Sequence, residues 1–430
     1  MTTERDPQRD VTQAPQVGAG PGARPRWRYI GPGLVAAATG VGAGDLVASL
    51  VAGSKYGYTL LWAVILGVIV KLAIGEAVGR WHLASGGTLL QGFASLGRWT
   101  AWYFGPYAIV FGFVYGGAIM SATALPLNAM FPVLSVTSWA VLAGLVGLVM
   151  VLIGGYFWFE RVMTVLVGVM FVTMVSCAIL LTPDVPQMLA GLAPVMPGGS
   201  LLYTLGLVGG VGGTITIASY GWWVTAKGWE GRGWLSVMRL DNAVGYVLTG
   251  IFVLSTLVVG AELLYVIGQD VAESEEGLLA VTGPLEDRFG PVVRVLFLIG
   301  FWAASMTSLI GAWNGVSLLF SDFLRRLRGR PDLHGEAVTK TLEFRAFVVW
   351  MAIPPMLLLL FEEPFLLVVI YAALGAMFLP FLAVTLLLLL NSDRVEPVDR
   401  SGWLSNTVLA GAAGLFAVLF AYELTGLFGG

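Results

Sequence analysis

The sequence predicts an all-α polytopic membrane protein, and three observations support this fold class. Hydrophobic residues make up 57% of the chain and charged residues only 11%, whereas soluble domains carry about 25% charged residues. The mean hydropathy is +0.84. About eleven apolar segments are long enough to cross roughly 30 Å of hydrocarbon, and glycine-rich stretches interrupt two of them. The single cysteine, Cys177, excludes a disulfide framework.

The first 28 residues are polar and rich in Pro, Gly and Arg. This composition predicts a disordered tail and argues against a signal peptide, which needs a short apolar core. The apolar segments that follow are expected to be transmembrane helices. Their approximate limits are 31–52, 58–78, 103–126, 136–154, 161–182, 200–223, 241–267, 291–320, 343–361, 365–390 and 403–428.

Basic residues predict the orientation of these helices, because cytoplasmic loops carry an excess of Lys and Arg. With the N-terminus inside, 19 of the 23 basic residues fall on the inner side, and only Lys55, Arg288 and Arg294 fall outside. The loop at 268–290 is acidic and lies on the outer side. An odd number of spans then places the C-terminus outside. The low cysteine content and the basic tail are compatible with a bacterial inner membrane.

Two glycine-rich breaks interrupt spans at matching positions in the two halves of the chain. The first is TGVGAGD at 39–45, and the second is VGGVGGTIT at 208–216. Unwound backbone at membrane depth persists only inside protein or beside a water-filled cavity. Because five spans separate the breaks, the halves would be inverted repeats with a substrate site near the midplane. Glycines that only allow close helix packing would give a similar pattern.

Polar groups next to the breaks are the first candidates for a binding site. Asp45 follows the first break, and a carboxylate near the bilayer centre is costly unless it pairs or meets water. It is therefore a candidate for a cation or proton site, or alternatively a cap on the second half-helix. Thr214, Thr216 and Ser219 follow the second break. Their hydroxyl oxygens suit hard cations or polar organic groups, although they could also bond back to their own helix.

Further polar residues within apolar segments are candidates for lining a transport pathway. Lys71 and Glu76 share one span, but their five-residue spacing places them on poorly matched helix faces. Lys71 is as consistent with a structural salt bridge to another span as with a coupling role, and Glu76 is also consistent with an interfacial pair with Arg80. Asn314 and Tyr371 could line the pathway or bond a neighbouring helix.

The sequence shows no catalytic or cofactor-binding constellation. It contains no HExxH motif and no P-loop lysine, and the glycines at 40, 42 and 44 lack the preceding strand that a nucleotide-binding loop needs. We therefore expect no enzyme activity, no cofactor and no nucleic-acid partner. The aromatic run after the second break is expected to form an interfacial belt. It comprises Tyr220, Trp222, Trp223 and Trp229.

Several stretches resemble the NRAMP family of divalent-metal transporters. They are GPGL at 31–34, GSKYGYTLLW at 53–62 and LASGGTL at 83–89, with a looser match at 308–315, SLIGAWNG. The resemblance covers about residues 29–390. It implies the LeuT-like fold with broken first and sixth helices. The two inverted five-helix repeats would occupy 29–182 and 200–390, and an eleventh helix would follow at 403–428.

The resemblance implies a metal site from which this sequence departs. The family's Asp-Pro-Gly-Asn aligns with 42–45, so Gly42 stands at the metal-binding Asp and Asp45 at the Asn. Its Met-Pro-His aligns with 216–218, so Thr216 replaces the sulfur ligand. The third span lacks the acidic residue that the family uses in its proton pathway. Without soft sulfur, a hard cation such as partly hydrated Mg²⁺ is favoured over Mn²⁺.

We therefore expect a secondary transporter that sits in the lipid bilayer and moves a divalent metal cation by alternating access, with an unidentified coupling ion. Asp45 would be the charged ligand, and Thr216 with carbonyls near Gly42 and Gly213 would complete the site. Ser219 is a further pathway candidate. The alternative is a carrier of a small organic solute, such as an amino acid or amine, whose ammonium would pair with Asp45. A channel or receptor is a third alternative, and a continuous conductance would favour the channel.

Overall fold

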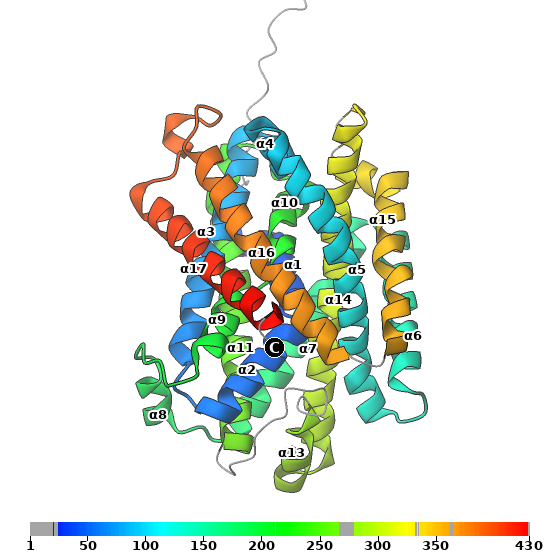
Figure 1. Cartoon of the computed structure of the whole chain (residues 1–430), viewed down its shortest axis with the longest axis vertical. Coiled ribbons are helices and arrows are strands. Elements are labelled where there is room, and N and C mark those ends of the chain that lie inside the picture. Colours follow the sequence, from blue (N-terminus) through cyan, green and yellow to red (C-terminus); the bar gives the residue numbers. More distant parts are fainter. Residues whose placement is uncertain are drawn as a thin grey trace, which may run out of the picture.

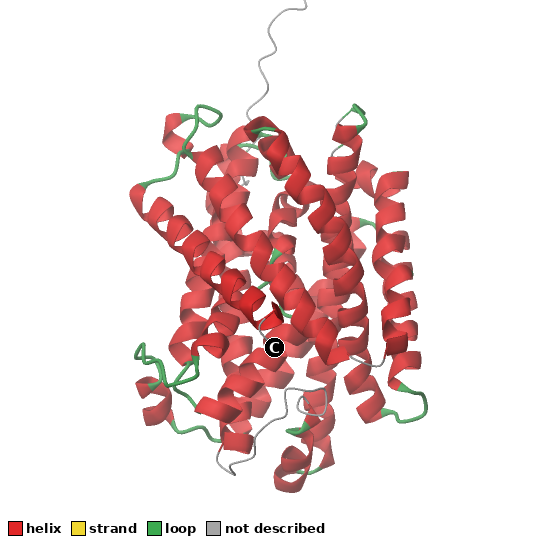
Figure 2. Ribbon diagram, viewed as in Figure 1, coloured by secondary structure: helices red, strands yellow, loops and turns green. Residues whose placement is uncertain are grey.

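The computed structural model describes residues 20, 25–210, 212–265, 279–331, 333, 335–361 and 364–428. This described part is helical and contains no strand (Figure 2). The tail predicted at 1–28 lies almost entirely outside the described residues, and so does much of the acidic loop predicted at 268–290.

The elements follow one another as helices joined by short connections. The first half contains η1 (Arg26–Tyr29), α1 (Pro32–Gly40), α2 (Ala43–Tyr56), α3 (Leu61–Ser85), α4 (Leu89–Leu96), α5 (Arg98–Met130), α6 (Val136–Ile153), α7 (Tyr156–Leu180) and α8 (Val185–Ala190). The second half contains α9 (Leu201–Gly210), η2 (Ile215–Ser219), α10 (Tyr220–Ala226), η3 (Arg232–Trp234), α11 (Leu235–Gly260), η4 (Ala261–Tyr265), α13 (Thr282–Phe289), α14 (Pro291–Leu327), η5 (Gly335–Lys340), α15 (Leu342–Ala352), η6 (Pro354–Phe361), α16 (Pro364–Leu390), η7 (Pro397–Asp399) and α17 (Trp403–Phe428).

Every predicted apolar segment corresponds to at least one of these helices. Within the described residues, seven helices are long and apolar enough to cross a membrane, and the bent pair α1–α2 makes up an eighth span. Several predicted limits are too narrow. The segment predicted at 58–78 overlaps α3, which begins at Leu61 and continues to Ser85. The segment predicted at 103–126 lies within α5, which begins at Arg98. Hydropathy locates the hydrocarbon region, whereas the helix continues into the polar region beyond it.

Local sequence signals explain where several helices begin and end. Thr88 caps α4 in a capping box, in which the Gln91 amide donates to Thr88 Oγ1 at 3.2 Å and the Thr88 amide donates to Gln91 Oε1 at 2.8 Å. Gly86 ends α3 in the left-handed conformation, with φ +68°. Pro291 occupies the first turn of α14, where a missing N–H costs nothing.

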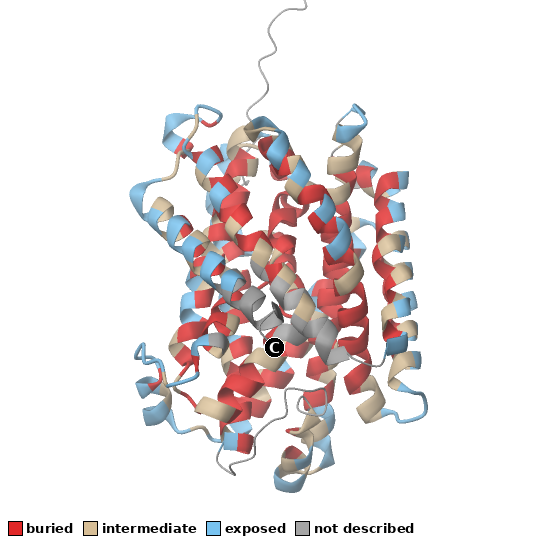
Figure 3. Ribbon diagram, viewed as in Figure 1, coloured by how far each residue is buried: buried red, intermediate tan, exposed pale blue. Residues whose placement is uncertain are grey.

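The short helices of the two interrupted spans lie inside the bundle (Figure 1). α1 packs against α11 and α14, α2 packs against α11 and α9, and α10 packs against α3. Among the long spans, α5 and α14 are the most buried and α6 is the least (Figure 3). The α4 end of the bundle is opposite the end that carries α8 and α13 (Figure 1).

Candidate cation site

The first break separates α1 from α2 within a single membrane span. The direction of the chain changes by 58° between the helical segments Pro32–Gly40 and Asp45–Tyr56. The change occurs because Gly42 adopts an extended conformation, with φ −110° and ψ −169°, before the second helix begins. The predicted break in the first span is therefore confirmed.

The second break lies in the sixth span, between α9 and α10. Gly212 and Gly213 have φ angles of +74° and +92°. Residues with a Cβ rarely adopt such angles, so the glycines are required by the backbone conformation at this point. The chain then resumes as the 3-10 turn η2 and continues directly into α10. The predicted break in this span is confirmed as well.

The two breaks lie directly against each other. A Cβ placed on Gly40 would lie 1.9 Å from the amide nitrogen of Gly213, so only glycine allows the two backbones to approach this closely. α14 covers this junction, because Ser308 Oγ donates a hydrogen bond of 2.9 Å to the Thr39 carbonyl. A Cβ on Gly42 would lie 3.0 Å from the same Ser308 oxygen. The crossing therefore brings residues about 170 positions apart in the sequence into one site.

Two polar side chains at this junction have unsatisfied oxygen atoms. Asp45 is 6% exposed, and its Oδ2 has no hydrogen-bond partner among the described residues. Thr216 is 4% exposed, and its Oγ1 likewise finds no partner in the part of the chain that the structure describes. A Cβ on Gly213 would lie 2.6 Å from this Thr216 oxygen. Buried polar atoms without partners are rare, and a bound ion is one way in which a protein satisfies them.

Ser219, three residues after Thr216, also has an unsatisfied hydroxyl oxygen. Its Oγ is buried and has no hydrogen-bond partner within the described ranges. A Cβ on Gly315 of α14 would lie 2.8 Å from this oxygen, so Ser219 faces α14. The sequence left open whether Thr216 and Ser219 bond back to their own helix. In the structure neither does, and both hydroxyl groups remain available as ligands.

Lys71 reaches the second break from α3. Its side chain is fully buried, and its ammonium donates to the Gly209 carbonyl at 2.9 Å and to the Gly213 carbonyl at a shorter distance. The ammonium also lies close enough to interact electrostatically with Asp45. The site thus contains one negative and one positive side chain. The sequence identified Lys71 as unusual but gave no sign that it binds the carbonyls of the break.

The remaining predicted pathway residues lie elsewhere or cannot be placed. Glu76 pairs with Arg80 at 3.1 Å and with Arg239 at 3.0 Å, which confirms the predicted i,i+4 pair. Asn314 accepts a hydrogen bond of 2.9 Å from Trp223 Nε1 on α10, so it bonds a neighbouring helix. The side chain of Tyr371 lies outside the described residues.

The prediction of an aromatic belt is wrong. All four aromatic residues of the run are buried, with exposed fractions of 5% or less: Tyr220, Trp222, Trp223 and Trp229. They pack between helices and do not cover the surface of the bundle. Hydrophobicity cannot distinguish these two positions, because both the membrane interface and a packed helix interface favour large aromatic residues.

Sequence reasoning also missed a second buried carboxylate, Asp241 on α11. Its side chain is fully buried and accepts hydrogen bonds from the Gly31 amide at 2.8 Å, the Gly33 amide at 2.5 Å and the Tyr220 hydroxyl at 2.9 Å. It therefore holds the beginning of α1. The available signal was a carboxylate at the start of the apolar segment predicted at 241–267.

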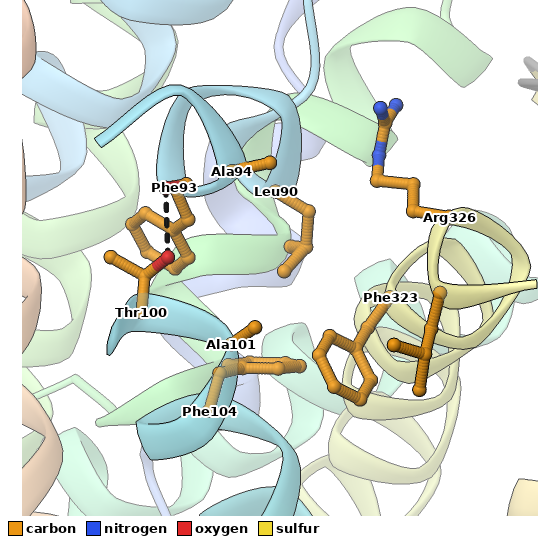
Figure 4. Close-up of a pocket in the computed structure, with 9 residues that line it drawn as sticks. Leu90, Phe93, Ala94, Thr100, Ala101, Phe104, Phe323 and Arg326 are labelled. Carbon is orange, nitrogen blue, oxygen red and sulfur yellow. Dashed lines mark hydrogen bonds between the residues drawn. The ribbon is translucent and has the colours of Figure 1, made fainter. Parts of the chain in front are cut away.

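Two of the cavities in the described part of the chain lie away from the breaks. One, of about 720 Å³, lies near α8 and includes Tyr58, Asp184 and Glu262 in its lining. The other, of about 180 Å³, lies between α4, α5 and α14 and is mainly apolar (Figure 4). Its charged lining residue, Arg326, pairs with Asp322 at 2.8 Å. The second cavity therefore does not offer ligands for a cation.

The donor set at the breaks determines what kind of ion could bind there. Among the described residues, no group of three or more His, Cys, Asp or Glu side chains could hold a metal ion. A cation at the junction would instead meet one carboxylate, hydroxyl groups, backbone carbonyls and water. Oxygen ligands of this kind suit hard cations.

Two broken spans that cross inside a helical bundle define the LeuT-like class of membrane transporter folds. Comparison with solved structures confirms this class. The structure is similar to a manganese transporter from Eremococcus coleocola, with a TM-score of 0.80, 16% sequence identity, and coverage of 98% of this chain and 92% of that one. It is also similar to a Na⁺-coupled sialic acid symporter, with a TM-score of 0.59, 13% identity, and coverage of 95% and 90%.

Sequence comparison identifies the family. The family described as natural resistance-associated macrophage protein-like, Nramp, matches residues 33–425, so the chain belongs to the Nramp family. A protein of Mycobacterium leprae named divalent metal cation transporter MntH is 27% identical over 323 residues, which are 70% of this chain and 72% of the relative. One of the same name from Chromohalobacter salexigens is 27% identical over 309 residues, covering 67% and 70%. The predictions of a transporter of this family, and not an enzyme, are confirmed.

Proposed function

We propose that this protein carries a divalent metal cation across the membrane by alternating access, and that the cation binds where the two breaks meet. The observation that carries the proposal is the buried Asp45 oxygen without a partner. A buried carboxylate oxygen without a hydrogen-bond partner is costly inside a membrane protein, even with the opposite charge of Lys71 nearby, so it persists where a ligand compensates for it. Asp45 would be the charged ligand, and Thr216 Oγ1 with carbonyls near Gly42 and Gly213 would supply neutral oxygens.

The ligand types favour a hard cation, and Mg²⁺ is the concrete candidate. Transition metals gain relative affinity from soft sulfur, and the hydroxyl of Thr216 stands where the resemblance implies a sulfur ligand. Mg²⁺ loses its water shell reluctantly and usually binds proteins through one or two carboxylates while it keeps several waters. One carboxylate with several neutral oxygens fits such a partly hydrated ion.

Flux measurements in proteoliposomes test this proposal. Wild type and Asp45→Asn are reconstituted, and Mg²⁺ and Mn²⁺ uptake are measured side by side. We expect saturable uptake in the wild type, with Mg²⁺ carried at least as well as Mn²⁺, and a loss of about a hundredfold in Asp45→Asn, which equals about 2.7 kcal/mol of cation binding. Asp393→Asn is the matched control, because Asp393 is 99% exposed and lies in a connection after α16.

The outcomes separate the parts of the proposal. Uptake of Mn²⁺ without Mg²⁺ would contradict the hard-cation assignment, but the proposal of a divalent-cation carrier would stand. Uptake that persists in Asp45→Asn would show that Asp45 is not a ligand of the cation. If folded wild type carries neither ion, the divalent-cation proposal fails.

One observation favours the alternative, a carrier of an amino acid or related zwitterion. Asp45 and Lys71 present one negative and one positive group, which match the ammonium and carboxylate of such a solute. Thermal stability of the purified protein distinguishes the two functions. Stabilisation by Mg²⁺ or Mn²⁺ but not by a panel of amino acids and amines would reject the alternative, and the reverse result would support it.

A further inference from the structure

Lys71 occupies carbonyl oxygens of the kind that a transported cation would use. Its ammonium donates to the carbonyls of Gly209 and Gly213, which flank the second break on either side. Unwound carbonyls in a broken span coordinate cations in transporters of this architecture. The ammonium therefore stands in a cation-binding position, tethered there by its own side chain from α3.

The surroundings of the ammonium are those of a bound cation. Besides the two carbonyls, the Phe416 ring of α17 lies with its centroid 5.5 Å from Lys71 Nζ, within range of a cation–π interaction. The Asp45 carboxylate supplies the opposite charge. The side chain is fully buried, so bulk water does not replace these contacts. Two carbonyls and an aromatic face thus contact the ammonium, and the Asp45 carboxylate attracts it without a direct hydrogen bond.

This arrangement sets two conditions for a divalent cation that enters the site. First, the charge of Lys71 cancels that of Asp45, so an arriving cation meets a pair with no net charge. Second, the Gly213 carbonyl, a predicted ligand, already accepts a hydrogen bond from Lys71. A cation can use Asp45 and this carbonyl fully only when the ammonium moves away.

We propose that the Lys71 ammonium is a resident cation that competes with the transported cation for the ligands of the site, and that Lys71 thereby determines cation affinity and selectivity. The inference rests on the proposed function, because it takes the junction of the breaks as the cation site. Competition of this kind keeps binding weak enough for release. It also excludes monovalent cations, which bring no more charge than the ammonium they would displace.

Equilibrium binding to purified variants tests the proposal. Lys71→Gln removes the charge but keeps an N–H donor for a carbonyl, and Lys71→Met removes both. We expect the affinity for Mg²⁺ and Mn²⁺ to rise by about tenfold or more in both variants, because a repulsive charge at the site is lost. We also expect Na⁺ to compete with Mn²⁺ in the variants but not in the wild type. The Michaelis constant for flux should fall with the dissociation constant.

Two control variants distinguish competition from a structural role. Lys71→Arg keeps the positive charge, so it should not gain affinity. Lys55→Gln removes a lysine that contacts Tyr203 at the end of α2, away from the breaks, and should not gain affinity either. If Lys71 only supports the fold, Lys71→Gln would lose stability and its cation affinity would stay equal or fall. That result would overturn the proposal.

A structure of the wild type with Mn²⁺ provides a test that does not depend on variants folding. Anomalous scattering locates the ion, and the distance from Lys71 Nζ to the Gly213 carbonyl is then measured. We expect the ion near Asp45 and the ammonium beyond hydrogen-bond distance of Gly213. An ion bound near Asp45 with the Lys71–Gly213 hydrogen bond intact would overturn the competition but leave the proposed function standing. Mn²⁺ bound elsewhere, or not at all, would instead contradict the proposed site.

Discussion

Asp45 and Asp241 are both buried carboxylates in spanning helices, but they differ in how many hydrogen bonds they accept. Asp241 accepts three hydrogen bonds, from two backbone amides at the start of α1 and from the Tyr220 hydroxyl. Asp45 keeps an oxygen without any partner among the described residues, beside two unwound stretches of backbone. Both cost free energy to bury. Asp45 has the opposite charge of Lys71 nearby, but only Asp241 has its hydrogen-bonding capacity satisfied by the described residues.

The difference supports a structural role for Asp241 and the proposed binding role for Asp45. A saturated Asp241 holds α1 against α11 and α10 and has little capacity left for a ligand. An unsaturated Asp45 gains most when a cation arrives. Burial alone does not distinguish the two, whereas the hydrogen-bond inventory does.

The largest expected effect is on stability, in Asp241→Ala. The substitution leaves two backbone amides and the Tyr220 hydroxyl without their acceptor inside the bundle. Each buried unsatisfied donor costs about 1–3 kcal/mol, so we expect a loss of at least about 3 kcal/mol. Thermal unfolding in detergent, followed by size-exclusion fluorescence, measures it against the exposed control Asp393→Ala. A melting temperature equal to that of the control would show that Asp241 does not hold α1.

Substitution of Thr216 should change transport without changing stability. Its hydroxyl has no partner within the described residues, so Thr216→Val removes no internal hydrogen bond. We expect cation flux to fall by about tenfold, the effect of about 1.4 kcal/mol of lost coordination. Thr216→Met should instead raise the ratio of Mn²⁺ to Mg²⁺ flux by about tenfold, because a thioether favours the softer ion. An unchanged ratio in the Met variant would place residue 216 away from the ion.

The stability of Asp45→Asn should differ from that of the wild type by no more than about 1 kcal/mol. The amide is less costly to bury than a charge. Lys71 loses the opposite charge of Asp45 but keeps its two carbonyl acceptors after the substitution, and these continue to stabilise the ammonium. The same unfolding assay measures this change in the absence of divalent cations. A destabilisation as large as that of Asp241→Ala would mean that Asp45 has a structural role like that of Asp241, and the comparison would fail.

The smallest effect is expected for a third carboxylate, Glu76. It pairs with Arg80 and Arg239 and is 18% exposed, so solvent screens its interactions. We expect Glu76→Gln to lose about 0.5 kcal/mol of stability and to transport cations like the wild type. A large loss of flux in the folded variant would show that Glu76 takes part in transport.

Much of the architecture could be predicted from the sequence, because hydropathy and glycine position act locally. The apolar segments located the spans, and the glycines at 40–44 and 209–213 located both breaks. The breaks could be recognised because backbone conformations such as those of Gly212 and Gly213 require glycine. Helix ends were less predictable, since helices such as α3 continue past the hydrocarbon into polar sequence.

The pairing of side chains could not be predicted in the same way, because it depends on which helices pack together. Lys71 binds carbonyls 138 and 142 residues away, and no spacing rule within α3 indicates that. Asp241 binds amides 208 and 210 residues away. The buried aromatic residues of α10 were unpredictable for a related reason. Their residue type is common both at the membrane–water interface and between packed helices.

Equilibrium binding of Mn²⁺ to folded Asp45→Asn, compared with folded Asp241→Asn, tests the central claim most directly. We expect Asp45→Asn to lose about a hundredfold in affinity, while the Asp241→Asn protein that remains folded binds Mn²⁺ like the wild type. Wild-type affinity in Asp45→Asn, or the loss of binding in Asp241→Asn alone, would contradict the assignment of Asp45 as the cation ligand.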